Sequence, residues 1–189
     1  MSLLFSGLHW ASFFRVVEVV DALIEMGCYD SDKRDFWGRT SLSRAARNSH
    51  QDAVKILLER REASPNKPNN FRETPLSYAA RHGQEGAVKI LLRLEEVHPD
   101  GLDCFGNTSL SYTAQYGHGG VVKVLLGPEE VNSQRLDSTG VTPLAHAARR
   151  GYKDVVKIFL AYEEVDPYKQ DTWDATMLWH TAGRGGQGG

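Results

Sequence analysis

The sequence has few cysteines, no long apolar run and little net charge, and so lacks the features of disulfide scaffolds, membrane anchors and nucleic-acid-binding proteins. It contains two cysteines in 189 residues and no CxxC pair, which argues against a disulfide framework or a zinc knuckle and favours a reducing compartment. No run reaches the roughly 18 apolar residues that a membrane span needs. The formal net charge of −2 gives no global attraction to nucleic acid or to an anionic membrane. We therefore expect an intracellular, cytoplasmic protein, with the nucleus left open.

Signals for secretion and catalysis are absent as well. The N-terminal stretch "MSLLFSGLHWASFF" has no Lys or Arg before its apolar part and is interrupted by His9, unlike a signal peptide. The sequence has no HExxH, GxSxG or P-loop motif. Its 41% of hydrophobic residues is nevertheless ordinary for a folded chain. These features predict a folded protein that is not an enzyme and that carries no cofactor and no metal.

A repeat with a period of 34 residues organises the sequence. The stretches "RTSLSRAARN", "ETPLSYAARHG", "NTSLSYTAQYG", "VTPLAHAARRG" and "ATMLWHTAGRG" follow one another at this interval, and "GLHWA" extends the series toward the N-terminus. The leucines that mark it are Leu8, Leu42, Leu76, Leu110, Leu144 and Leu178. A unit of this length cannot bury its apolar face alone and must stack on copies of itself. The sequence therefore predicts an all-α solenoid of stacked helix-turn-helix units.

Each period begins with a predicted turn and continues with two helices. The turn starts at Asp35, Asn69, Asp103, Asp137 and Asp171. Glycine three residues later, at Gly38, Gly106 and Gly140, suits a positive φ, and we expect the turns with Arg72 and Asp174 at this position to be shaped differently. The threonines that can cap the first helix are Thr40, Thr74, Thr108, Thr142 and Thr176. Glycines at Gly83, Gly117 and Gly151 should end that helix, and apolar residues at helical spacing, such as "AVKILL" at 87–92, predict the second one.

The period gives an expected domain organisation. We expect one repeat domain over residues 1–182, with repeats at about 1–34, 35–68, 69–102, 103–136, 137–170 and a partial unit at 171–182, followed by a Gly-rich tail at 183–189. The sequence begins inside its first repeat and ends after one helix of a sixth. We expect either a fragment of a longer array or ends that cap themselves by local packing.

The repeat resembles a known family. The segments "ETPLSYAARHGQEGAVKILL" and "VTPLAHAARRGYKDVVKIFL" are similar to the T-P-L-x-x-A-A-x-x-G-x-x-x-x-V-x-x-L-L signature of the ankyrin repeat, and the resemblance extends from about Gly7 to Ala182. The family's usual unit has about 33 residues, and the extra residue here follows the second helix. This variant resembles ankyrin arrays common in filamentous fungi, often the C-terminal part of larger multidomain proteins. The resemblance implies projecting β-hairpin-like turns, and a partner bound at the turn tips and the first helices.

Recurring polar residues offer two interpretations. His50 and His118 share one position of the repeat, and His146 and His180 share another. This recurrence favours a structural role, in hydrogen bonds to a neighbouring repeat's loop, over catalysis or metal binding. The carboxylate pairs Glu95/Glu96, Glu129/Glu130 and Glu163/Glu164 also recur. A loop edge exposed to solvent explains them better than acid–base chemistry, which needs two carboxyls converging on one pocket.

Two sets of side chains are candidates for binding a partner. Four of the five turns carry an aromatic residue two positions after their first residue, at Trp37, Phe71, Phe105 and Trp173, with Thr139 in the fifth. Such rings are either hot spots for a partner or packed on the adjacent turn. Near the end of the first helices, Arg47, Arg81, His82, Gln115, Tyr116, Arg149 and Arg150 form a largely basic set. This set fits an acidic, partly apolar protein or peptide, although arginines on a solvated helix would look the same.

The resulting hypothesis is an ankyrin-repeat scaffold for protein–protein interaction, present as a monomer or as part of a larger chain. One alternative is a regulatory or sensing segment of a larger enzyme, such as a nucleoside-triphosphatase switch protein, with the catalytic module elsewhere. Another is nucleic-acid binding through the arginines, which would show steep salt dependence. Its only further support is a single RGG in the C-terminal "GRGGQGG", so no nucleic-acid partner is expected.

Overall fold

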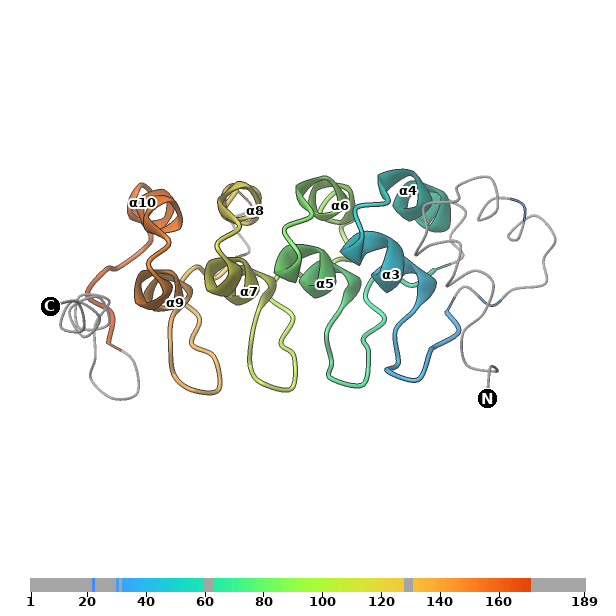
Figure 1. Ribbon diagram of the computed structural model, residues 1–189, viewed down its shortest axis with the longest axis horizontal. Helices are drawn as coiled ribbons and strands as arrows, with labels where there is room; N and C mark the ends of the chain where they lie inside the picture. The colour runs from blue at the N-terminus through green and yellow to red at the C-terminus, as the bar shows by residue number, and fades with distance from the viewer. Residues whose placement is uncertain (1–21, 23–29, 31, 60–62, 128–130, 171–189) are drawn as a thin grey trace, which may run out of the picture. The chain divides into compact units, whose positions relative to one another are not determined.

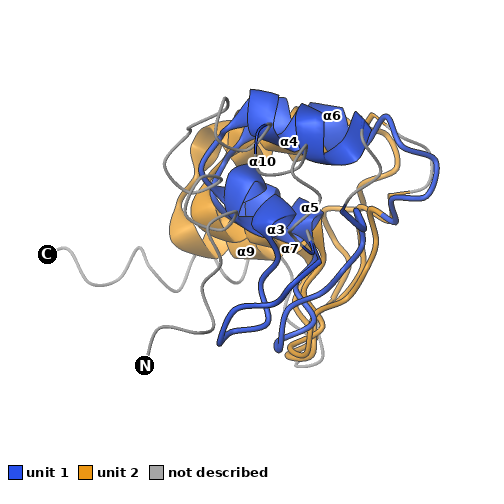
Figure 2. Ribbon diagram, turned by 90° about the vertical axis from the view of Figure 1, so that its right-hand side faces the viewer, with its two compact units in different colours: residues 1–98 blue, residues 99–189 orange. Residues whose placement is uncertain are grey.

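The computed structural model describes residues 22, 30, 32–59, 63–127 and 131–170. The chain forms two compact units, residues 1–98 and residues 99–189 (Figure 2). Across the described ranges every regular element is a helix and no strand is present, which confirms the prediction of an all-α repeat fold.

Each unit contains two described helix pairs. In the first unit these are α3 (Ser41–Arg47) with α4 (Gln51–Glu59), and α5 (Pro75–Arg81) with α6 (Glu85–Leu91). In the second unit they are α7 (Ser109–Tyr116) with α8 (Gly119–Leu125), and α9 (Pro143–Arg150) with α10 (Lys153–Leu160). We call the first member of each pair the inner helix and the second the outer helix. Inner helices pack on inner helices and outer on outer within each unit (Figure 1).

The inner helices begin where the threonines predicted them to begin. The side-chain oxygens of Thr40, Thr74, Thr108 and Thr142 each accept a hydrogen bond from the backbone N–H three residues later. Pro75 and Pro143 occupy the first position of their helices, where the missing N–H costs nothing. Such a cap is worth about 1 kcal/mol, so local sequence fixes the start of each inner helix.

The periodic apolar residues form the core. The leucines Leu42, Leu76, Leu110 and Leu144 of the inner helices are buried, as are Val54, Leu57, Val88, Leu91, Val122, Leu125 and Phe159 of the outer helices. Ala45 and Ala79, on the inner helices α3 and α5, are fully buried. Each buried leucine contributes about 1.5–3 kcal/mol through burial. The 34-residue repeat therefore places the same apolar positions in the core of each described helix pair. Leu8 and Leu178 lie outside the described residues.

The inner helices end in a left-handed residue, which is Ser49 in one pair and glycine in the other three. Gly83, Gly117 and Gly151 have φ of 71°, 80° and 78°. Ser49 takes φ 62° at the equivalent place, after α3. The left-handed region costs a residue with a Cβ about 1–2 kcal/mol, so this position carries strain that its counterparts avoid.

We predict that Ser49→Gly stabilises the protein. Relief of the strain outweighs the roughly 0.5–1 kcal/mol entropic cost of an added glycine. The net gain of about 0.5–1 kcal/mol corresponds to a rise in Tm of roughly 1–4 °C by circular dichroism. The control Ser49→Ala keeps the strain and should give no rise, and an equal rise for both variants would contradict the explanation.

Candidate functional site

The turns between repeats form short hairpins that project beyond the inner helices (Figure 1). We call residues 35–39, 69–73, 103–107 and 137–141 the turn hairpins. In the first, the Asp35 N–H donates to the Arg39 carbonyl at 3.0 Å and the Gly38 N–H donates to the Asp35 carbonyl at 2.8 Å. The other three repeat both bonds. The β-hairpin-like turns predicted from the family resemblance are thus present in all four described repeats.

One side-chain oxygen at the start of each hairpin organises its backbone. The Oδ1 atoms of Asp35, Asn69, Asp103 and Asp137 each accept the N–H groups two and four residues later, at 2.8–3.0 Å. Short polar side chains favour turns because they can bond to their own backbone in this way. An aspartate or an asparagine serves equally, since both supply the accepting oxygen.

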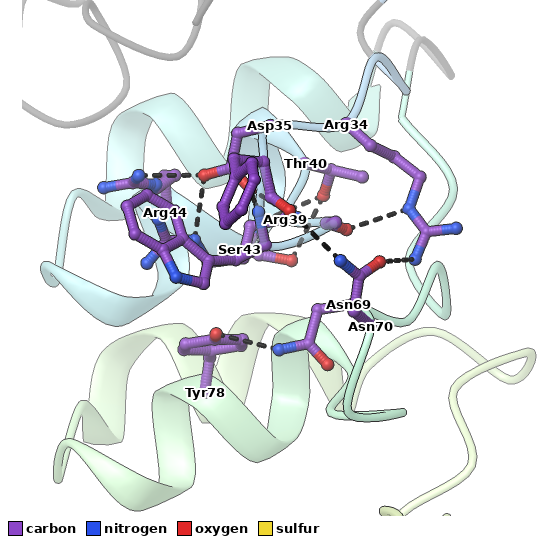
Figure 3. A network of polar contacts seen from close by, with 12 residues as sticks. Arg34, Asp35, Arg39, Thr40, Ser43, Arg44, Asn69, Asn70 and Tyr78 are labelled. Atoms are coloured by element: carbon purple, nitrogen blue, oxygen red, sulfur yellow. Dashed lines mark hydrogen bonds and ion pairs between the residues drawn. The ribbon is translucent and has the colours of Figure 1, made fainter. Parts of the chain in front are cut away.

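The second side-chain atom of the same residue ties the hairpin to its inner helix. Asp35 Oδ2 accepts hydrogen bonds from Arg39 Nε and Arg44 Nη2, both at 2.9 Å (Figure 3). The equivalent partner, nine residues after the hairpin begins, is Tyr78, Tyr112 or His146 in the other repeats. Burial alone would raise the pKa of Asp35, but its hydrogen bonds from the Arg39 backbone and the Arg44 side chain lower it.

The hairpin with Arg72 does not differ in shape from the others, so that prediction was wrong. Arg72 has φ 64°, beside 77°, 74° and 74° at Gly38, Gly106 and Gly140. The Asn69 side chain holds the N–H groups of Phe71 and Glu73 just as aspartate does elsewhere. The hydrogen bonds thus impose the turn on a residue that local propensity would not place there. Asp174 lies outside the described residues.

The aromatic residues of the hairpins are exposed. Trp37, Phe71 and Phe105 expose 47%, 46% and 55% of their surface. Their backbones are nevertheless held in place, because in each unit an aromatic carbonyl accepts an N–H from the next hairpin. Asn70 donates to Trp37 at 3.0 Å and Ser138 donates to Phe105 at 3.1 Å. The described hairpins therefore expose large rings on a fixed backbone. Trp173 lies outside the described residues.

Trp37 belongs to a cluster that sequence reasoning found only in part. The neighbouring Phe36 is 71% exposed and meets the Trp37 ring edge-on, with centroids 5.6 Å apart. The Arg39 guanidinium lies 4.1 Å from the Trp37 ring centroid, a cation–π contact. A second ring in a turn position that is usually polar was the signal in the sequence that could have identified Phe36.

Three of the candidate residues on the inner helices are engaged inside their own repeats. Arg81 pairs with Glu73 at 2.7 Å, and Gln115 Nε2 donates to Asn107 Oδ1 at 2.8 Å. Arg149 donates from Nη2 to Nδ1 of His146, three residues earlier on the same helix, at 3.0 Å. These side chains reach back along the helix toward the hairpin, so part of their polar capacity is already used.

The other candidate residues of the inner helices include the exposed His82, Tyr116 and Arg150. His82 stacks on Tyr78, with centroids 6.5 Å apart. Tyr116 stacks between Tyr112 and His118, and Arg150 lies 5.9 Å from its ring centroid. Arg47 is half-buried, and its carbonyl accepts from Gln84 at 3.0 Å. The inner helices therefore contribute rings and cations at their C-terminal ends.

Positive charge is concentrated in the first unit. Residues 34–50 and 68–84, which form its hairpins and inner helices, contain six arginines against two carboxylates, a net charge of +4. The equivalent residues of the second unit, 102–118 and 136–152, contain two of each and are neutral. The basic set predicted from the sequence is thus unevenly distributed, although the whole chain carries −2.

No constellation for catalysis or metal binding emerges from the described residues. Among them no group of three or more His, Cys, Asp or Glu side chains could hold a metal ion. His146 Nε2 lies 2.6 Å from Asp137 Oδ2 within its own repeat, and Gln115 of the neighbouring repeat lies 3.4 Å away. Of the carboxylate pairs, Glu95/Glu96 and Glu163/Glu164 are exposed, whereas Glu129/Glu130 lies outside the described residues.

Two depressions in the first unit also lack catalytic geometry. One, of about 470 Å³, is lined by residues 48–52 after α3. The other, of about 570 Å³, contains the carboxylates Asp32 and Glu96. Both oxygens of Asp32 are already bonded, to the Ser64 N–H at 2.9 Å and to Lys67 Nζ at 3.3 Å. Asp32 therefore anchors a loop.

The family follows from comparison with known proteins. A sequence model of ankyrin repeats in three copies matches residues 8–100 and 93–171. The chain belongs to the ankyrin-repeat family. Ankyrin repeats are in general modules for protein–protein interaction. A search among curated proteins found no match to this chain. Of the helices that the structure describes, none combines the length and apolar character needed to cross a membrane.

We predict that the Asp137–His146 contact makes the stability of the fold decrease as the pH falls below about 4. Burial alone would raise the pKa of Asp137, but hydrogen bonds from His146, the Val141 N–H and Thr139 hold it well below the ordinary value of 3.8. A lowered carboxylate pKa stabilises the fold above about pH 4 and loses this contribution as the pH falls further. Asp137→Asn should therefore lower Tm at pH 7, and its deficit relative to wild type should shrink below pH 4.

The reason for the deficit is a conflict between donors. Arg149 can only donate, so His146 Nδ1 accepts and its Nε2–H faces Asp137. An asparagine NH₂ in place of the Asp137 Oδ2 would meet that N–H, at a cost of about 1–3 kcal/mol. Asp154→Asn, at an exposed carboxylate of α10, is the control. Parallel Tm curves for Asp137→Asn and wild type across this pH range would refute the prediction.

Proposed function

We propose that this protein binds another protein through the turn hairpins and the C-terminal ends of its inner helices, without an active site of its own. The observation that carries the proposal is the exposure of Trp37, Phe71 and Phe105 on hairpins whose backbones are held by hydrogen bonds. Exposed aromatic rings on a pre-formed surface bind at a low cost in conformational entropy. They are also the side chains most often found as interface hot spots.

The chemistry of the surface indicates the chemistry of the partner. Rings at the hairpins favour apolar or aromatic side chains, and the net charge of +4 on the hairpins and inner helices of the first unit favours carboxylates. We propose an acidic, partly apolar protein or peptide segment as the partner. Nucleic acid is less well supported, because the equivalent residues of the second unit are neutral and the chain as a whole is slightly acidic.

We also propose a narrower relationship, to the 34-residue ankyrin arrays of filamentous-fungal multidomain proteins. The support is the extra residue after each outer helix, which keeps the 34-residue interval through the described repeats. Under this proposal the array would regulate a larger enzyme such as a nucleoside-triphosphatase switch protein. The partner would then be another segment of the same protein, and the binding surface would be unchanged.

We predict that Trp37→Ala combined with Phe71→Ala weakens binding at least tenfold without unfolding the array. Each ring is worth about 2 kcal/mol or more when a partner buries it. The immobilised full chain would capture proteins from a nuclease-treated native extract, and wild type and variant would be compared by quantitative mass spectrometry. Circular dichroism would verify that helix content is equal.

Leu160→Ala provides the matched control. Leu160 belongs to outer helix α10 and to none of the hairpins, and its 48% exposure matches the 47% of Trp37. Proteins retained by wild type and by this control, but lost with the double variant, would support the proposal. Identical retention by all three chains would show that the rings do not bind partners.

A further inference from the structure

Arg72 occupies a position that the fold otherwise gives to glycine. The other described hairpins have Gly38, Gly106 and Gly140 there, all with positive φ. Two of these glycines also have no room for a side chain. A Cβ on Gly38 would lie 2.7 Å from the backbone nitrogen of Asn70, and one on Gly106 would lie 2.6 Å from that of Ser138. Arg72 adopts φ 64°, so the backbone accepts strain to place a long cationic side chain at this point.

The fold gains no side-chain contact in return. Among the residues that the structure describes, the Arg72 side chain makes no hydrogen bond, ion pair or ring contact, and the residue is exposed. Its backbone N–H donates to Asn69 at 3.1 Å, a bond that glycine makes equally well in the other hairpins. Strain that is not offset within the fold is a feature that occurs at functional sites.

Four other arginines of segments 34–50 and 68–84 are occupied by contacts within the fold. Arg39 and Arg44 both bond to Asp35, and Arg81 bonds to Glu73. Arg34 donates to the carbonyls of Gly38 and Pro68 and to the Asn70 side chain (Figure 3). Arg72 is therefore the arginine of these two hairpins whose guanidinium remains available to a ligand.

The available guanidinium stands next to exposed apolar surface. Phe71 directly precedes it and is exposed, and the hairpin of Trp37 lies alongside, joined by the Asn70–Trp37 backbone hydrogen bond of 3.0 Å. A free arginine and two rings on adjacent hairpins offer a planar, bidentate cation beside an apolar platform. The surrounding segments carry a net charge of +4, which favours an anionic ligand group.

We propose that Arg72 determines specificity by pairing with an Asp or Glu side chain of an acidic peptide segment, whose neighbouring apolar side chain packs on Phe71 and Trp37. This inference rests on the proposed function, since it assigns one residue's role within the same surface. It adds that the left-handed backbone at Arg72 lowers stability in favour of recognition, so replacement of Arg72 by glycine should raise stability and lower affinity.

The test selects random displayed peptides against the immobilised full chain, in wild-type form and as Arg72→Gly. Wild type should enrich peptides with Asp or Glu next to an apolar residue. Arg72→Gly should lose the acidic enrichment, keep the apolar enrichment and bind a synthetic wild-type-selected peptide about tenfold more weakly. Its Tm should rise by roughly 1–4 °C. Changing the acid of that peptide to Asn or Gln should weaken wild type similarly and leave Arg72→Gly unaffected.

Two further variants separate charge from strain. Arg72→Ala keeps the strain and removes the cation, so it should lose affinity without the rise in Tm. Ser49→Gly relieves the same kind of strain after α3 and keeps Arg72, so it should raise Tm and still enrich acidic peptides.

The outcomes distinguish this inference from the proposed function. Equal acidic enrichment by wild type and Arg72→Gly, or equal affinity for the selected peptide, would overturn the role of Arg72 and leave the ring surface intact. A Tm that does not rise in Arg72→Gly would overturn the exchange of stability for recognition. Selection of no peptide by wild type would overturn the proposed function itself, and the role of Arg72 with it.

Discussion

The hydrogen bonds of one short polar side chain at the start of each hairpin hold the proposed binding surface in place. In the first hairpin, Asp35 accepts two backbone N–H groups with one oxygen and anchors to the inner helix through Arg44 with the other. The same residue thus shapes the hairpin and fixes its attachment to the helix behind it. The other described hairpins keep this arrangement with Tyr78, Tyr112 or His146 as the anchor. Every exposed side chain at the hairpin ends depends on this connection.

This constraint also explains what the recurring polar side chains of the described repeats do. Histidine, tyrosine and arginine at the anchoring position are buried against the first residue of their own hairpin, as His146 is against Asp137. Arg81 and Gln115 are engaged by Glu73 and Asn107. At the hairpins and the ends of the inner helices, the described residues expose rings such as Trp37 and cations such as Arg150 on a pre-formed backbone. Such a surface suits recognition of another macromolecule.

Two features of the fold could be predicted from the sequence: the buried core positions, which repeat, and the helix starts, which depend on local capping residues. The 34-residue spacing predicted the core because the same apolar positions recur in every unit, and Thr40 and its equivalents predicted the helix starts because a cap acts over a few residues of chain. The sequence did not predict the shape of the hairpin with Arg72, since the hydrogen bonds of the Asn69 side chain override the preference of arginine for a negative φ. It also missed that Arg81 folds back on Glu73, because an eight-residue separation across a hairpin and a helix follows no helical period. The partner-binding role of the surface residues stays a prediction.

The central claim is that a partner contacts the hairpins of the first unit. The most direct test is chemical-shift mapping of the full chain during titration with a peptide selected by the wild-type protein. The account predicts that the largest shifts fall on residues 34–39 and 69–73, including the Trp37 indole N–H, with small shifts in the outer helices α4 and α6. Largest shifts on those outer helices, with the Trp37 indole unchanged, would contradict it.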